Sequence, residues 1–211
     1  MEKIKKGDFV EFDFTAKVKD GEVFDTSIED EAKKYNLIDE KHNKKFEPLR
    51  ICVGLGMTLK GVDNTLINKE PGKEYEIEIP PQDAFGKRNP GLIKIFSLSS
   101  FTQKGMMPER GVFINLNGLL AKIVSVSGGR VVVDFNNPLA DKYVIYKIKI
   151  NRIISEEKEK IECIAKFYFE EYEIEEKEKK FELIVKGKKI ANIEKKIKEL
   201  FPDLEIRYQV P

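Results

Sequence analysis

Residues 48–66 read PLRICVGLGMTLKGVDNTL and place a strand, a glycine-containing loop and a short helix in immediate succession. Apolar residues alternate with others across 49–53, which is the period of a strand with one apolar face. After the loop, Leu59, Val62 and Leu66 recur at helical spacing. This stretch predicts a helix that a tight turn lays across a sheet.

The glycine loop also invites comparison with a dinucleotide-binding loop, because Gly54 and Gly56 follow a strand and open a helix. A dinucleotide loop needs the spacing G-x-G-x-x-G inside a parallel βαβ unit. Here the third glycine is Gly61, and residues 74–79 alternate as an antiparallel strand does. We therefore expect a tight turn and no phosphate site.

The composition is that of a folded chain without a strong charge. The 211 residues are 41% hydrophobic and 36% charged, which allows a sizeable core and more than one domain. The net charge of +1 gives no overall field toward nucleic acid or an acidic membrane, and no stretch approaches transmembrane length. Cys52 and Cys163 lie far apart and the first ten residues lack an apolar signal core, so we expect a reducing, cytoplasmic location. The composition, rich in Lys and Glu and free of Trp, is typical of hyperthermophile proteins.

Antiparallel strands are predicted in two separate parts of the first domain. Residues 10–18, 49–53 and 75–79 alternate between apolar and polar side chains, and residues 144–150 resume the same pattern. Residues 29–41 read as a solvated helix over this sheet. The sheet needs the late strand to bury its apolar face.

Between these parts lies a stretch of different texture. Residues 112–116, 119–126 and 131–135 are short apolar runs, and Gly128-Gly129 predicts a hairpin turn. This pattern predicts a small all-β module that interrupts the first domain.

The last part of the chain predicts a β-β-α-β unit after the charged run 155–162, which reads as a solvated linker or helix. Its expected elements are strands over 161–169, 181–185 and 204–210 and a helix over 190–200. The first strand is apolar on both sides, and one helix covers one sheet face. We therefore expect the remaining face to form a homodimer contact or a second surface for client proteins.

Five motifs in order carry a family resemblance: VEFDFTAKV at 10–18, VFDTS at 23–27, PLRICVGLGMTLKGVD at 48–63, DAFG at 83–86 and NNPLA at 136–140. Together they resemble FKBP-type peptidyl-prolyl cis/trans isomerases, in the SlyD-like and archaeal form that carries an insert in the flap. The resemblance covers residues 1–153.

The resemblance implies an α+β fold, with an antiparallel sheet wrapped on a short helix. It implies three domains: a discontinuous isomerase domain at 1–86 and 138–153, an insert-in-flap β domain at 87–137, and the C-terminal α+β domain at 156–211.

Nine residues take the places of the family's pocket residues: Phe14, Phe24, Asp25, Leu49, Thr58, Leu59, Val62, Phe85 and Tyr146. The resemblance implies that Asp25 is a polar contact at the rim and that the Leu59 amide anchors a substrate carbonyl. Val62 stands where many members have Trp, Leu49 where they have Phe, and Phe85 where they have Tyr. The pocket should therefore be wider and should bind a macrolide only weakly.

No cofactor and no metal are expected. His42 is the single histidine and has no nearby cluster of metal ligands in the sequence. Asn137 replaces a histidine of the family, and the histidine-rich tail of bacterial SlyD is missing, so nickel binding does not carry over.

The resemblance implies a prolyl isomerase with chaperone activity, whose partners are unfolded or nascent chains that contain X-Pro bonds. Two alternatives stay open. The substituted pocket could leave a non-catalytic holdase, or the C-terminal unit could bind nucleic acid or the ribosome through its lysines. Those lysines are interleaved with Glu, which favours a solvated face; they are Lys186, Lys188, Lys189, Lys195, Lys196 and Lys198.

Overall fold

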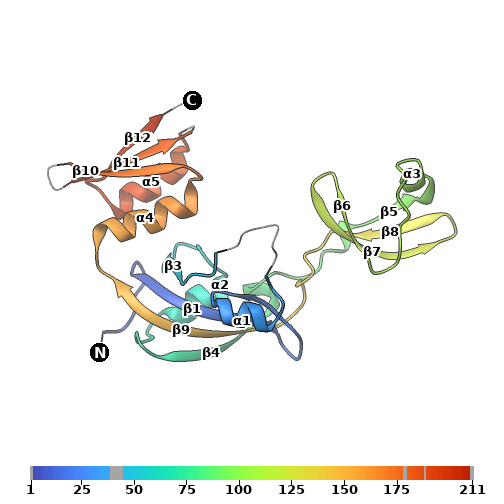
Figure 1. Cartoon of the computed structure of the whole chain (residues 1–211), viewed down its shortest axis with the longest axis horizontal. Helices are drawn as coiled ribbons and strands as arrows, with labels where there is room; N and C mark the ends of the chain where they lie inside the picture. The colour runs from blue at the N-terminus through green and yellow to red at the C-terminus, as the bar shows by residue number, and fades with distance from the viewer. Residues whose placement is uncertain (1, 39–44, 178–179, 188, 210–211) are drawn as a thin grey trace. The chain divides into compact units, whose positions relative to one another are not determined.

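The computed structural model describes residues 2–38, 45–177, 180–187 and 189–209 (Figure 1). It divides into two compact units, one of residues 1–79 and 144–211 and one of residues 80–143. The second unit contains the predicted insert and extends a few residues beyond it on either side. Three residues named in the sequence predictions, His42, Lys188 and Val210, lie outside the described residues.

The first unit is built on an antiparallel sheet of five strands: β1 (Phe9–Val18), β2 (Val23–Thr26), β3 (Leu49–Cys52), β4 (Glu74–Ile79) and β9 (Val144–Ile154). The order is β2-β1-β9-β4, and β3 also pairs with β1. Strand β1 buries Val10, Phe12 and Ala16 at every second or fourth position, so one face forms the core. The four strands predicted for this sheet are confirmed, and the last one continues to Ile154.

Helix α2 (Lys60–Leu66) buries Val62 and Leu66 and contacts β4. The contact is close at Gly61, where a Cβ would lie 2.2 Å from Cγ2 of Ile79. Only glycine lets the helix approach the strand this far.

The loop before α2 is closed by a buried carboxylate. Asp63 accepts hydrogen bonds from the amides of Gly54, at 2.7 Å, and Gly56, at 3.2 Å. Both glycines have positive φ angles of 89° and 69°, which suits the turn. The loop amides therefore bind a carboxylate of the same chain, in agreement with the tight-turn interpretation.

Helix α1 (Glu29–Lys34) is shorter than the helix predicted over 29–41. Asn36 has a left-handed φ of 55°, and the Leu37 amide donates to the Ala32 carbonyl at 2.9 Å. This is the geometry that ends a helix. The prediction of a solvated helix is confirmed, since Ala32 is the one buried residue of α1. The predicted length was wrong.

The second unit contains four antiparallel strands in the order β5-β8-β7-β6. The elements are η1 (Pro81–Asp83), η2 (Pro90–Leu92), β5 (Ile93–Ser97), α3 (Leu98–Thr102), β6 (Phe113–Leu116), β7 (Leu119–Ser127) and β8 (Arg130–Asp134). The three predicted strands are confirmed. Strand β5 and the five-residue helix α3 were not predicted, and Phe101 of α3 is part of the buried core of this unit.

The C-terminal elements are α4 (Glu157–Tyr168), β10 (Tyr172–Lys177), β11 (Lys180–Lys186), α5 (Ala191–Leu200) and β12 (Glu205–Gln209). They contain the predicted β-β-α-β succession, but the strand predicted over 161–169 is wrong. These residues lie almost entirely in helix α4, and the first strand of the succession is β10. Helix α4 contacts β3 of the main sheet and also β10 and β11, so apolar residues occur on more than one of its sides.

The C-terminal sheet also corrects the expectation of an uncovered apolar face. Ile174 of β10 lies beside Leu183 of β11, which lies beside Ile206 of β12, and all three share one face. On the other face Glu182 of β11 pairs with Arg207 of β12 at 2.9 Å. Leu183 and Ile184 lie on opposite faces of β11 and are 0% and 5% exposed, so neither face of this strand is left uncovered. The homodimer through 156–211 stays a prediction. The uncovered apolar face on which it was based is not present in the described residues.

Candidate active site

Three aromatic rings meet where β1, β2 and β9 lie together. Tyr146 of β9 stacks on Phe14 of β1 with ring centroids 5.7 Å apart, and Phe24 of β2 meets Tyr146 edge-on at 6.3 Å. Tyr146 pairs across the ladder with Ala16, whose small side chain leaves room for the ring. The three predicted aromatic residues of the main sheet are therefore brought together.

Hydrogen bonds fix the end of β2 against β1. The Phe14 amide donates to Oγ of Ser27 at 3.0 Å, and the Ser27 hydroxyl donates to Asp13 at 2.8 Å. Oγ1 of Thr26 donates to the Phe14 carbonyl at 2.8 Å. These bonds hold the neighbouring residues of β2, among them Asp25, in place beside the rings.

A pocket of about 650 Å³ opens beside this cluster. Five of the predicted site residues line it: Phe14, Asp25, Leu49, Thr58 and Tyr146. The lining thus combines aromatic and aliphatic walls with a carboxylate and a hydroxyl, in a space large enough for a ligand of several residues.

The Tyr146 hydroxyl remains protonated in this setting. Burial, together with the nearby Asp25 carboxylate, raises the pKa of Tyr146 above the usual value for a tyrosine. The phenol is therefore a neutral hydrogen-bond donor throughout the physiological range.

The other four predicted residues are not among those that line the pocket. Val62 is completely buried in α2, and Leu59 is half-buried at the N-terminal end of that helix. Phe24 contributes through its ring contact with Tyr146. Phe85 belongs to the second unit, where it is half-buried.

Several residues of the pocket were not predicted. Some lie on the main sheet or its loops, where Phe12, Ile51 and Met57 are buried. Others come from helix α4: Glu162, Cys163, Lys166 and Phe167. Cys163, Lys166 and Phe167 have the i, i+3, i+4 spacing of one helix side, a signal that the prediction of a strand concealed.

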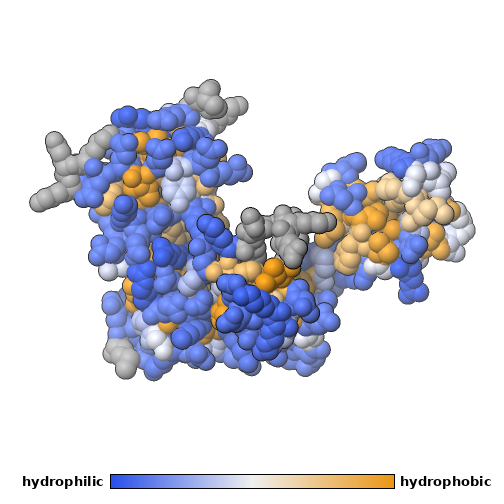
Figure 2. All heavy atoms as spheres, viewed as in Figure 1, coloured by the Kyte–Doolittle hydropathy of each residue, from blue (hydrophilic) through white to orange (hydrophobic). Residues whose placement is uncertain are grey.

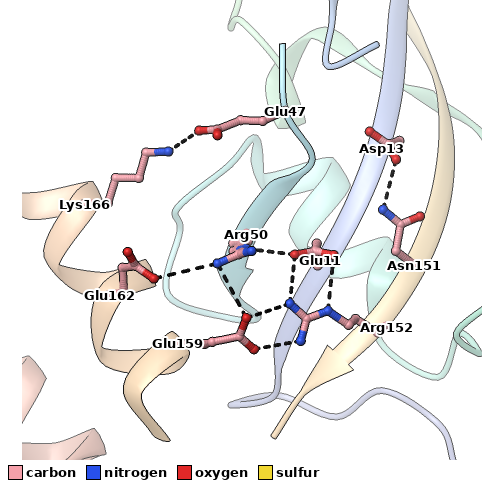
Figure 3. A network of polar contacts seen from close by, with 9 residues as sticks. All are labelled: Glu11, Asp13, Glu47, Arg50, Asn151, Arg152, Glu159, Glu162 and Lys166. Carbon is pink, nitrogen blue, oxygen red and sulfur yellow. Dashed lines mark hydrogen bonds and ion pairs between the residues drawn. The ribbon is translucent and has the colours of Figure 1, made fainter. Parts of the chain in front are cut away.

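A network of ion pairs joins α4 to the main sheet beside the pocket (Figure 3). The Arg152 guanidinium bonds Glu159 of α4 at 2.7 Å and Glu11 of β1 at 3.1 Å. Arg50 of β3 bonds Glu11 at 2.8 Å, and Lys166 pairs with Glu47. The hydrogen bond from Lys166 lowers the pKa of Glu47, so this carboxylate stays charged at neutral pH. The network fixes α4 as one side of the site.

The cysteines near the site are not poised as nucleophiles. Burial raises the pKa of both the Cys52 and the Cys163 thiols to about 12. Neither thiol is ionised at neutral pH. The pocket can remove water from a bound group and donate hydrogen bonds to it without covalent chemistry.

Two kinds of feature are absent from the ranges that the structure describes. In them, no helix has the length and apolar character needed to cross a lipid bilayer. The same ranges hold no group of three or more His, Cys, Asp and Glu side chains arranged to bind a metal ion.

Family comparisons match two stretches of the chain. Residues 1–97 match the family described as FKBP-type peptidyl-prolyl cis-trans isomerase, and residues 94–139 match the IF domain of FKBP26. The second match falls within the second compact unit.

Individual relatives carry the same description. A short-type peptidyl-prolyl cis-trans isomerase of Methanocaldococcus jannaschii is 35% identical over 156 residues, which cover 74% of this chain and 98% of that protein. SlyD of Helicobacter pylori is 28% identical over 54% of this chain and 65% of its own length. An FKBP-type 16 kDa isomerase of Escherichia coli K12 is 29% identical over 54% of this chain and 79% of its own.

Proposed function

The chain belongs to the family of FKBP-type peptidyl-prolyl cis-trans isomerases, and from this premise we propose that its pocket binds proline segments of folding proteins while its insert holds unfolded chain. The partners are polypeptides that contain X-Pro bonds, and the site of action is the cytoplasm. The observation that carries the pocket assignment is the stacked pair Phe14–Tyr146 with Phe24 at its edge, beside a pocket of about 650 Å³.

The chemistry of the reaction suits such a pocket. Rotation about an X-Pro bond breaks amide resonance, with a barrier of about 20 kcal/mol and relaxation over tens of seconds. No proton and no electron pair must be transferred to the protein. An apolar wall disfavours the charge-separated planar imide relative to the twisted form, so removal of water lowers the barrier.

Each residue of the site then has a distinct role. The rings of Phe14 and Tyr146 form the apolar wall against the proline. Asp25 is the polar contact at the rim, and the backbone amide of Leu59 anchors a substrate carbonyl. Val62 takes the family's floor position with a side chain smaller than an aromatic residue, and on this ground we expect weak macrolide binding.

A relaxation assay tests this assignment. A short peptide is transferred into conditions in which its cis X-Pro fraction must relax, and the rate is measured with micromolar protein. An isomerase accelerates the relaxation in proportion to protein concentration. A holdase, the alternative function, leaves the rate at its uncatalysed value while still binding unfolded chains.

The insert is supported as a holding surface by its exposed apolar residues. Figure 2 shows orange side chains gathered on the second unit. Within residues 87–137 the large apolar residues that are exposed are Leu92, Ile93, Ile95, Met107, Val112, Phe113, Leu119, Leu120, Val124 and Val126. Exposed apolar surface of this extent is typical of interaction sites, and a flexible methionine such as Met107 adapts to varied partners.

A pair of substitutions tests the holding surface. Leu119 and Leu120 stand at the start of β7, are 62% and 58% exposed, and can both be changed to Ser without opening the core. We expect weaker binding of an unfolded, proline-free client. The control is Lys94→Ser, which changes an exposed polar residue on β5 of the same unit and removes no apolar surface. Equal client binding by both variants would remove this part of the proposal.

A further inference from the structure

Helix α4 supplies a wall of the pocket that the sequence did not indicate. Cys163, Lys166 and Phe167 all line the pocket, and their spacing puts them on one side of the helix. Ile161 and Ile164, elsewhere on the helix surface, are 1% exposed. Lys166 and Phe167 therefore lie on the pocket side of α4, whereas Ile161 and Ile164 are committed to the core.

Phe167 is the apolar side chain of this wall that keeps a large free surface. It is 47% exposed, whereas Cys163 is 5% exposed. Its ring meets the edge of Tyr168 with centroids 4.9 Å apart, which restricts its orientation. A half-exposed ring on the wall of a pocket has apolar surface left to bury against a ligand.

Four of the charged residues that line the pocket together with Phe167 form ion pairs with one another. Lys166 pairs with Glu47, and Arg50 pairs with Glu11 at 2.8 Å. Paired charges attract a charged ligand weakly. The wall therefore favours an apolar side chain over an acidic or basic one.

The wall is also fixed in advance of binding. Arg152 bonds Glu159 of α4 through two nitrogens, at 2.7 and 2.9 Å, and holds Glu11 of β1 with the same guanidinium (Figure 3). A rigid wall does not have to be ordered when the ligand arrives, which favours binding.

We propose that Phe167 is a substrate-contacting residue that the C-terminal segment adds to the isomerase site, and that it binds an apolar side chain of an extended polypeptide some residues away from the X-Pro bond. This inference rests on the proposed function of the pocket. A pocket of about 650 Å³ is in the range that holds a drug-sized molecule, so it has room for residues beside the proline. The C-terminal segment would then select among proline segments by their flanking residues.

The test compares two peptides on the full-length protein. Both contain the same X-Pro pair, and the longer one carries Phe or Leu side chains on either side at increasing distance. We expect Phe167→Ala to lower the ratio of kcat/KM for the long peptide to that for the short one by about fivefold, chiefly through KM, since the value of one aromatic contact is about 1 kcal/mol. Phe167→Leu should restore part of the loss.

The control is Ile190→Ala, which removes a 46% exposed apolar side chain from the same segment away from the pocket. It should keep the wild-type ratio. Thermal unfolding of each variant checks that the fold is intact. A Phe167→Ala protein with the wild-type ratio, or a loss as large with Ile190→Ala, would overturn the inference.

Titration calorimetry of the same peptides separates this inference from the proposed function. If the wild-type protein binds the peptides but leaves their relaxation unchanged, the catalytic assignment fails, and Phe167 is still judged by the affinity ratio of the two peptides. If catalysis is present and Phe167→Ala leaves both the affinity ratio and the kinetic ratio unchanged, only the role of Phe167 fails.

Discussion

The pocket of the first unit and the apolar surface of the insert use similar side chains in opposite ways. In the pocket, Phe14 and Tyr146 stack on each other and Tyr146 is 7% exposed. In the insert, Ile95 is 65% and Met107 82% exposed. Rings held between strands can exclude water from a reacting bond, while loose apolar groups on a surface can only retain a chain for a time. This difference is the basis of our proposal that one unit catalyses and the other holds unfolded chain.

The largest effect should come from removing the stacked ring. Tyr146→Ala deletes two aromatic contacts, each worth about 0.5–1.5 kcal/mol, so we expect a fall in kcat/KM on short peptides of about fivefold to a hundredfold. Client holding by the insert should not change. Tyr146→Phe keeps the ring and is the matched control, with a much smaller loss. Phe24→Ala and Asp25→Ala should also impair catalysis.

The next largest effect should come from removing the insert, which tests the proposed holding function. Replacing residues 87–136 by a short loop should leave relaxation of small peptides near the parent rate. Acceleration of the refolding of a proline-limited protein should fall by about tenfold, because a held client is present at a raised effective concentration. A variant that refolds proteins as well as the parent would show that the insert holds nothing of consequence.

A smaller effect, on stability, is expected from Gly61→Ala. Its Cβ would meet Ile79 at 2.2 Å and push α2, with Val62, away from β4. Such overpacking costs about 1–3 kcal/mol of stability, measured by denaturant unfolding. Adding Ile79→Ala relieves the clash, so the double variant should lose less than the two single changes together. Fully additive losses would contradict the close contact.

The smallest effect concerns pH. The pKa of Tyr146 is raised, so its phenol stays protonated as the pH rises, and the Cys163 thiol with a pKa of about 12 does the same. Between about pH 6 and 9 neither group changes charge, and kcat/KM should vary less than about twofold. A bell-shaped pH profile in that window would show that a titrating acid or base takes part in catalysis.

The sequence predicted the main sheet well because each strand has one buried face, so that Val10, Phe12 and their counterparts mark every second position. Helix α4 was mistaken for a strand because the apolar residues of its second half, from Ile161 to Tyr168, fall on more than one side of the helix and hide its period. The error concealed the α4 wall as well. No spacing rule links Lys166 to Glu47 across the chain, so this part of the site required the structure.

The pocket residues known from the motifs lie together where their strands meet, because the ladder brings Ala16 and Tyr146 side by side. Phe85 stays a prediction from the resemblance, since it lies in the other compact unit. Physical pattern alone could not have chosen Phe14 and Phe24 over other core aromatics. The family motifs made that choice.

Exchange NMR of a short proline peptide with the full-length protein tests the central claim most directly. We predict cis–trans exchange peaks that require the protein, together with peptide-induced shifts at the amides of Phe14, Asp25 and Tyr146 and none on strands β6 and β7. Exchange accompanied by shifts confined to β6 and β7, or binding at Phe14 and Tyr146 without exchange, would contradict the assignment of catalysis to this pocket.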